Sequence, residues 1–122
     1  MRLRTLALSL AAALGIAMLG FAPTASATMA QCTVGHFCVW EDGGFQGHFG
    51  AVTVGHPDLR TAINGFVFQD RISSVWNRTG HIWCTYKDIN YNGGVHSWNP
   101  NESQSHLGGI GWGDTISSLK PC

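Results

Sequence analysis

The sequence has 122 residues, of which only 11% are charged, with seven basic and seven acidic side chains and a formal net charge of zero. A chain of this length forms one small domain. Because it has no excess of positive charge, it does not have the electrostatic signature of a protein that binds nucleic acid or an anionic membrane surface.

Residues 1–27 have the pattern of a secretory signal peptide. Arg2 and Arg4 form a short positive region, an apolar stretch rich in Ala and Leu runs to Leu19, and Ala-Ser-Ala ending at Ala27 is a small-residue cleavage site. The alternative is an uncleaved amphipathic helix. We expect a secreted, extracellular protein whose mature part, residues 28–122, has no stretch long and apolar enough to insert into a membrane.

The mature part is rich in Gly, Asn, Ser and aromatic residues and shows no long helical periodicity, which predicts an all-β fold. A turn, or one helical turn, is expected at 56–60, because the proline there suits a first helical position. A loop is expected at 100–105 and a glycine-rich stretch at 107–113. Strands are expected at 37–41, 49–54, 66–68, 72–76, 82–86, 95–98 and 116–119.

Two motifs occur twice and in the same order. Asp-Arg-Ile-Ser-Ser at 70–74 recurs as Asp-Thr-Ile-Ser-Ser at 114–118, and each copy is followed by an aliphatic residue. Upstream of each copy, CVWEDGGFQG at 38–47 matches CTYKDINYNG at 84–93, with the Cys, the Asp and the last Gly identical. The chain is therefore two copies of one unit. Four strands per unit, with a long connection between the second and third, indicate a Greek key, and two such units pack as a β-sandwich.

All four cysteines lie in the mature part, and an even number in a small secreted domain predicts two disulfides with three possible pairings. The repeat favours Cys32–Cys38 and Cys84–Cys122, because Cys122 follows the last strand of the second unit and can reach back to Cys84. At the corresponding place in the first unit stands Arg78, so Cys32 is the nearest partner for Cys38. The alternatives are a Cys38–Cys84 bridge that ties the units together, or free thiols.

The hairpin spacing (an aromatic, four residues, an aromatic, one residue, a glycine) and the Asp-x-x-Ser-Ser corners together resemble the βγ-crystallin Greek-key family. The apparent signal peptide, the early cysteine pair and Cys-Val-Trp-Glu-Asp at 38–42 narrow the resemblance to the secreted actinobacterial metalloproteinase-inhibitor family. The resemblance covers residues 32–122. It implies an all-β domain of two βγ-crystallin-like Greek-key units, about 37–77 and about 82–120, packed as a disulfide-stapled β-sandwich.

The aromatic residues of the two hairpins are interpreted as packing residues rather than as a surface on which a ligand stacks. These residues are Trp40, Phe45, Tyr86 and Tyr91. Of the other tryptophans, those at positions 76 and 98 are expected in the core, and those at positions 83 and 112 at the surface.

The resemblance also implies calcium, which many members bind through two Asn/Asp residues, two variable residues, Ser/Thr and Ser. Here Gln69 and Gly113 stand at the first position of that loop. With few charged ligands the resemblance implies weak binding, on the order of 10⁻⁴–10⁻³ M. The alternative is that the Asp and Ser residues only cap the corners. The ligands carried over are side-chain oxygens of Asp70, Ser73, Asp114 and Ser117, with backbone oxygens near Arg71 and Thr115 and, in the hairpins, near Glu41 and Lys87.

The function implied is that of a secreted peptidase-inhibitor-like binding protein, a monomer that presents a rigid, disulfide-held edge or loop to the cleft of a secreted protease. One alternative is a calcium-binding extracellular βγ-crystallin module with a structural or stress role and no inhibitory activity. A further alternative is an antimicrobial or cell-wall-directed protein, against which the near-neutral charge counts.

The sequence has none of the common catalytic motifs: HExxH, Gly-x-Ser-x-Gly and a phosphate-binding glycine loop are all missing. Its six histidines are scattered, and no two have the spacing of metal ligands. We therefore expect neither enzymatic activity nor a zinc site.

Overall fold

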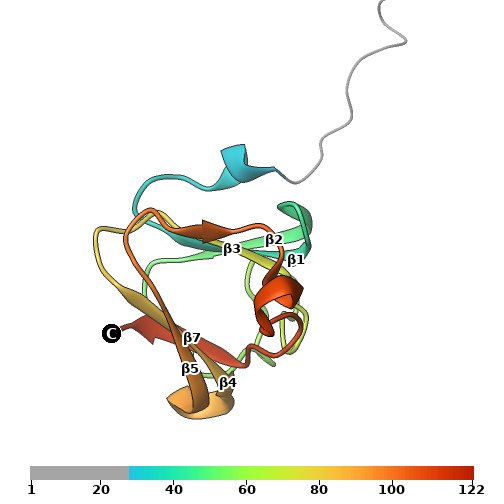
Figure 1. Cartoon of the computed structure of the whole chain (residues 1–122), viewed down its shortest axis with the longest axis vertical. Helices are drawn as coiled ribbons and strands as arrows, with labels where there is room; N and C mark the ends of the chain where they lie inside the picture. Colours follow the sequence, from blue (N-terminus) through green and yellow to red (C-terminus); the bar gives the residue numbers. More distant parts are fainter. Residues whose placement is uncertain (1–27) are drawn as a thin grey trace, which may run out of the picture.

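The structure is a computed structural model that describes residues 28–122, so the expected signal peptide lies outside the described residues. This part of the chain forms two antiparallel sheets and three short 3-10 helices (Figure 1). None of its helices has the length and apolar character needed to cross a membrane. In chain order the elements are η1 (Met29–Gln31), β1 (Phe37–Asp42), β2 (Gln46–Val52), β3 (Ser74–Asn77), β4 (Trp83–Asp88), η2 (Ile89–Tyr91), β5 (Asn92–Trp98), β6 (Ser103–Gln104), η3 (Leu107–Ile110) and β7 (Ser118–Pro121).

Each sheet consists mainly of one repeat unit, with a segment added from the other. The first sheet has the strand order β2-β1-β3-β6, and its last strand comes from the second unit. The second sheet has the order β5-β4-β7, and His56 of the first unit forms a bridge with Leu119 in β7. This exchange interlocks the two Greek keys, and it confirms the predicted all-β sandwich of two units.

The strand expected at 66–68 is wrong. Phe66 makes only an isolated bridge to Ile63, across the two-residue turn Asn64-Gly65, where φ is positive at both positions. Asn-Gly is the favoured pair for such a tight turn, and it closes the chain on itself before a strand can form. The segment that reaches the other sheet is instead His56, ten residues earlier in the chain. The other expected strands overlap observed ones, and β6 forms within the loop expected at 100–105.

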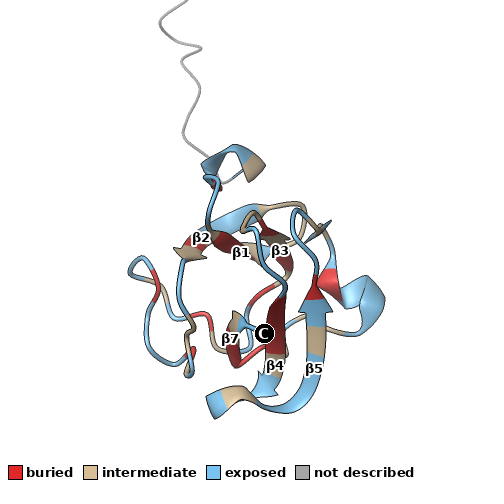
Figure 2. Cartoon of the chain, turned by 90° about the vertical axis from the view of Figure 1, so that its left-hand side faces the viewer, coloured by how far each residue is buried: buried red, intermediate tan, exposed pale blue. Residues whose placement is uncertain are grey.

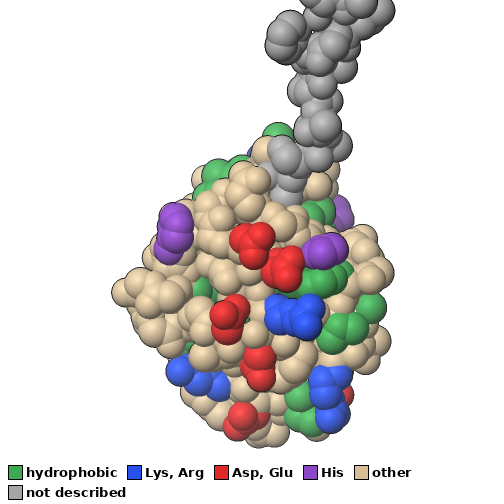
Figure 3. All heavy atoms as spheres, turned by 90° about the vertical axis from the view of Figure 1, so that its right-hand side faces the viewer, with side chains coloured by type: hydrophobic (Ala, Val, Ile, Leu, Met, Phe, Trp, Pro, Cys, Tyr) green, Lys and Arg blue, Asp and Glu red, His purple; other side chains and the backbone are tan. Residues whose placement is uncertain are grey.

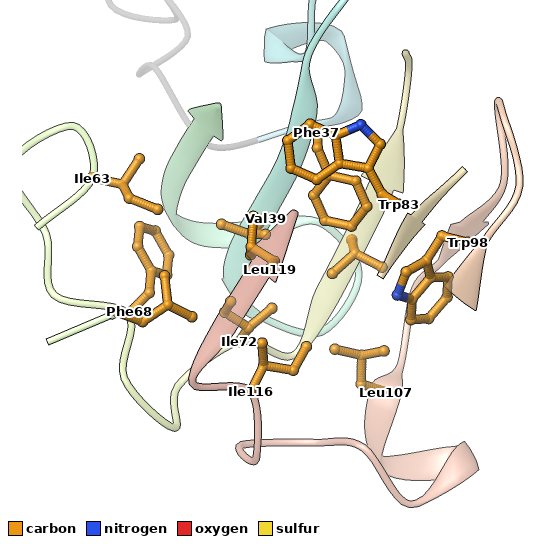
Figure 4. Close-up of a cluster of buried hydrophobic side chains, with 12 residues drawn as sticks. Phe37, Val39, Ile63, Phe68, Ile72, Trp83, Trp98, Leu107, Ile116 and Leu119 are labelled. Carbon is orange, nitrogen blue, oxygen red and sulfur yellow. The ribbon is translucent and has the colours of Figure 1, made fainter. Parts of the chain in front are cut away.

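The core fills the space between the two sheets (Figure 4), and the first residues of β1 and β4 are buried (Figure 2). Trp83 contradicts the sequence-based expectation, because it is buried and stacks on Phe37 with ring centroids 5.0 Å apart. Its indole joins the aromatic core at the start of β4, where the first residues of both units meet. Trp98 is buried as expected, whereas Trp76 and Trp112 are only partly buried.

Both disulfides of the favoured pairing are present. Cys32–Cys38 has a Cα–Cα distance of 5.9 Å, and Cys84–Cys122 has one of 5.8 Å. The first ties the N-terminal segment to β1, while the second joins β4 to the end of the chain. Each sheet is therefore held at its start by a covalent link, which restricts the unfolded chain.

Candidate functional site

The second serine of each repeated corner locks the hairpin that precedes it. The Ser74 hydroxyl donates to the Asp42 carbonyl at 2.7 Å and accepts from the backbone N–H of Phe45 at 3.1 Å. In the second unit, Ser118 makes the equivalent pair of bonds to Asp88 at 2.6 Å and Tyr91 at 3.0 Å. These serines are part of the scaffold, and they hold the aromatic residues of each hairpin in contact.

The aromatic pairs of the two hairpins pack as interpreted from the sequence. Trp40 and Phe45 meet edge to face, with ring centroids 5.1 Å apart, and Tyr86 and Tyr91 do the same at 5.7 Å. Phe45 and Tyr91 both have positive φ angles. An aromatic residue in this conformation is strained, and ring packing of this kind contributes to holding it there.

The first serine of each corner faces the aspartate of the other corner. Ser73 Oγ lies 3.3 Å from Asp114 Oδ1, and Ser117 Oγ lies 3.4 Å from Asp70 Oδ1. Both aspartates have positive φ, and each donates its backbone N–H to the opposite corner, at Ile116 or Ile72. The resemblance lists these oxygens as parts of each corner's own motif, whereas the structure pairs the oxygens of one corner with those of the other.

The Ser117 side of this junction has more oxygen acceptors than donors. The hydroxyl donates to the Lys87 carbonyl at 2.7 Å and has no second hydrogen for the Asp70 carboxylate. The Gln69 side chain donates its Nε2 to Ser117 at 2.8 Å, while its Oε1 is buried without a hydrogen-bond partner. The oxygens of Asp70, Ser117 and Lys87 thus gather with one hydroxyl hydrogen between them, which is an arrangement that suits a cation.

The Ser73 side is a polar hollow of about 230 Å³ with a positive charge in its wall. It is lined by Glu41, Asp42, Asp70, Arg71, Ser73 and Asp114. On the face drawn in Figure 3, acidic side chains form a band with basic side chains beside it. The guanidinium of Arg71 offsets only one of the four carboxylates in this lining, and Gly113 contributes no side chain.

A histidine stands next to this hollow. His48 Nδ1 lies 2.8 Å from a carboxylate oxygen of Glu41, and the imidazole stacks on Phe66 with ring centroids 3.9 Å apart. The hydrogen bond from His48 lowers the pKa of Glu41 below its ordinary value. Within residues 28–122 no group of three or more His, Cys, Asp or Glu side chains is placed to hold a metal ion.

Sequence reasoning named the oxygens of Asp70, Ser117 and Lys87 but did not assign a role to Gln69. That residue was noted only as a departure from the calcium motif. Its unpartnered buried oxygen depends on how the first corner packs against the second, and the sequence contains no signal for that contact.

Comparisons with known proteins identify the family and the fold of this chain. The sequence model of the family described as Peptidase inhibitor family I36 matches residues 25–99, more than half of the chain. No curated protein is similar enough in sequence to count as a relative of this chain.

Solved structures match over most of the described residues. A βγ-crystallin domain from work on the evolution of the eye-lens fold is 23% identical, with a TM-score of 0.66 over 75% of this chain and 88% of that one. A βγ-crystallin from Ciona intestinalis is 25% identical, with a TM-score of 0.62 over 72% and 100%. A βγ-crystallin domain from Flavobacterium johnsoniae is 28% identical, with a TM-score of 0.58 over 69% and 90%. The fold is therefore that of a βγ-crystallin domain.

Proposed function

The chain belongs to peptidase inhibitor family I36, and from this membership we propose that it is a secreted, non-catalytic protein that binds a peptidase and blocks its cleft. The family match carries this proposal, since a βγ-crystallin fold alone does not determine a function. The two disulfides are consistent with an oxidising, extracellular location.

The scaffold supports this function because it is rigid before it binds. Two interlocked Greek keys share one core, and a disulfide holds the start of each sheet. A preorganised binding surface loses little conformational entropy on association, so more of the contact energy appears as affinity.

The test is a titration of purified residues 28–122 against a panel of secreted metallopeptidases and serine peptidases. We expect stoichiometric inhibition of at least one of them, with the protein recovered intact. Slow digestion of the protein by every peptidase in the panel would refute the proposal. A matched sample with both disulfides reduced and alkylated is the control, and we expect it to lose inhibition.

A second function, weak calcium binding, is favoured by the surplus of acceptors around Ser117. We propose that Asp70, Ser117 and the Lys87 carbonyl hold Ca²⁺, which would neutralise the carboxylate and offset the shortage of hydrogens between these oxygens. With a single carboxylate in the set, the affinity we expect is weak, on the order of 10⁻⁴–10⁻³ M.

Calorimetry and thermal melts of EDTA-treated protein test the calcium proposal. At a Ca²⁺ concentration equal to Kd, mass action stabilises the fold by about 0.4 kcal/mol, so we expect a small rise in Tm at millimolar Ca²⁺. Asp70→Ala should abolish this rise more completely than Asp114→Ala, because Asp70 lies at the Ser117 cluster and also lines the Ser73 hollow, which Asp114 lines as well. No response at about 10 mM Ca²⁺, ten times the upper expected Kd, would show that the corners serve only as structural turns.

A further inference from the structure

One apolar side chain near the start of the described chain is held out in solvent. Val34 is 74% exposed, more than the other large hydrophobic side chains of residues 28–122, of which Val54 at 70% comes nearest. Figure 1 shows its segment (cyan) at the surface, outside the two sheets. An isolated exposed valine is common in proteins, so what distinguishes this one is the loop that carries it.

The loop is a closed ring with a tight turn at its tip. The disulfide Cys32–Cys38 joins its two ends, and within it the N–H of His36 donates to the carbonyl of Thr33 at 3.3 Å. Gly35 has a φ of +93°, which makes the turn type II and places Val34 at its outer corner. The ring contains no Asp, Glu, Lys or Arg, so the surface it presents is small, aliphatic and uncharged.

Arg78 braces this ring from three directions. Its carbonyl accepts from the N–H of Gly35 at 2.8 Å, its own N–H donates to the His36 carbonyl at 2.9 Å, and its guanidinium Nη1 donates to the Cys32 carbonyl at 2.8 Å. The guanidinium also lies over the Trp76 ring, 4.6 Å from its centroid. The exposed loop is therefore fixed by a disulfide, a turn and a side-chain clamp.

The internal repeat shows that the brace is specific to the first unit. In the second unit the residue equivalent to Arg78 is Cys122, whose N–H donates to the Ile82 carbonyl at 3.0 Å, just as Arg78 donates to His36. Cys122 uses its side chain to close a disulfide to Cys84. The first unit thus replaces that bond with an arginine whose side chain holds an additional, valine-tipped ring.

We infer that this ring, residues 32–38, is the segment that contacts the peptidase, and that the Val34 side chain enters an aliphatic specificity pocket of the enzyme. The inference rests on the proposed inhibitory function. A branched aliphatic side chain matches a small apolar pocket, as in elastase-like serine peptidases, and lacks the charge that a trypsin-like pocket requires. The tight turn keeps the peptide out of the extended conformation that a peptidase cleaves, so the ring binds without being cut.

The first experiment compares Val34→Asp with Val54→Asp, which places the same charge at a valine of similar exposure elsewhere on the surface. Inhibition constants are measured with pancreatic elastase, thermolysin and trypsin, and thermal melts check that both variants fold. We expect Val34→Asp to weaken inhibition of elastase or thermolysin by about 10- to 100-fold. Val54→Asp is expected to inhibit as the wild type does.

The outcomes separate this inference from the proposed function. If the wild type inhibits elastase or thermolysin but both variants do so equally well, the ring is not the contact, and the proposed function stands. If the wild type inhibits trypsin alone, the aliphatic pocket is wrong. If it inhibits no peptidase in a wide panel, the proposed function fails and the inference fails with it.

Arg78→Ala tests the brace, since Arg78 positions the ring without being its apolar tip. Loosening the ring should raise the inhibition constant and allow slow cleavage between Cys32 and Cys38, seen as two fragments only after the disulfide is reduced. Arg60→Ala, at an exposed arginine whose side chain pairs with Asp58, is the matched control. An Arg78→Ala ring that stays intact with unchanged inhibition would overturn the positioning role.

Discussion

Replacing Gly47 by alanine tests the folded hairpin that gives each unit its shape. Gly47 has a φ of +79°, a conformation that an L-residue rarely adopts. A Cβ at this position would lie 2.6 Å from Asp42 Oδ2 and 3.3 Å from the Asp42 backbone nitrogen. The equivalent Gly93 has the same φ and the same 2.6 Å approach to Asp88 Oδ2, so both units depend on one geometry.

Two costs contribute to the expected destabilisation. The left-handed conformation costs an alanine about 1–2 kcal/mol relative to glycine. The Asp42 side chain must also rotate away, which is a smaller cost because its carboxylate is exposed and can move. We expect Gly47→Ala to lower the free energy of unfolding by about 2 kcal/mol, which lowers the Tm of a domain of this size by about 8–16 °C.

Thermal melts followed by circular dichroism measure this change, with Gly80→Ala as the matched control. Gly80 does not have a left-handed φ, and a Cβ there would meet no heavy atom within 4 Å. We expect Gly80→Ala to leave Tm unchanged or slightly raised, since alanine reduces the entropy of the unfolded chain. If Gly47→Ala melts with the control, the hairpin does not require a left-handed residue at this position and the geometry inferred for both units is wrong.

Three further predictions concern the serine lock, the long disulfide and pH. Ser118→Ala leaves the Asp88 carbonyl and the Tyr91 N–H without their partner, so we expect urea melts to show a loss of about 1–3 kcal/mol in the free energy of unfolding. Ser97→Ala, at an exposed position of β5, should change that free energy little, and equal effects of the two substitutions would contradict the lock. Replacing both cysteines of the Cys84–Cys122 disulfide by serine should lower the free energy of unfolding by up to about 4 kcal/mol, because its ends are 38 residues apart. The same replacement in the Cys32–Cys38 disulfide, whose ends are 6 residues apart, should lower it by less, and the reverse order would argue against chain entropy as the cause. The pKa of Glu41 is lowered in the folded state, so its stabilising effect is present above its ordinary value of 4.5 and is lost as pH falls below it. Glu41→Gln should therefore be less stable than wild type at neutral pH, by less than about 1 kcal/mol because the pair is partly exposed. This difference should shrink as pH falls below 4.5, and a difference that grows on acidification would refute the assignment.

The sequence determined the features that depend on local residue patterns. Two copies of an aromatic-led hairpin and of an Asp-x-x-Ser-Ser corner predict two Greek-key units, because glycine, aspartate and paired serines have specific roles in turns. The repeat also favoured the observed disulfides, since equivalent positions in two copies of one unit must lie in equivalent places. These features need only neighbours within the same unit.

The exchange between the sheets was not predictable in the same way. The sequence indicated a strand at 66–68 because three apolar residues there resemble one, but the turn at Asn64-Gly65 folds that segment onto Ile63. His56 does reach the second sheet, but this pairing involves the backbone of a single residue, so the sequence around His56 shows no hydrophobic pattern that would indicate a strand. Trp83 was expected at the surface because a residue at the start of a strand gives no indication of what will cover it.

Tertiary packing alone decided which groups meet at the candidate sites. It placed the oxygens of one corner against the serine of the other, because the two corners exchange backbone hydrogen bonds across the units. It also set Arg78 against the N-terminal ring, where an arginine replaces the cysteine of the second unit. Contacts between distant segments depend on how whole sheets pack, and the residue pattern of either segment by itself does not contain that information.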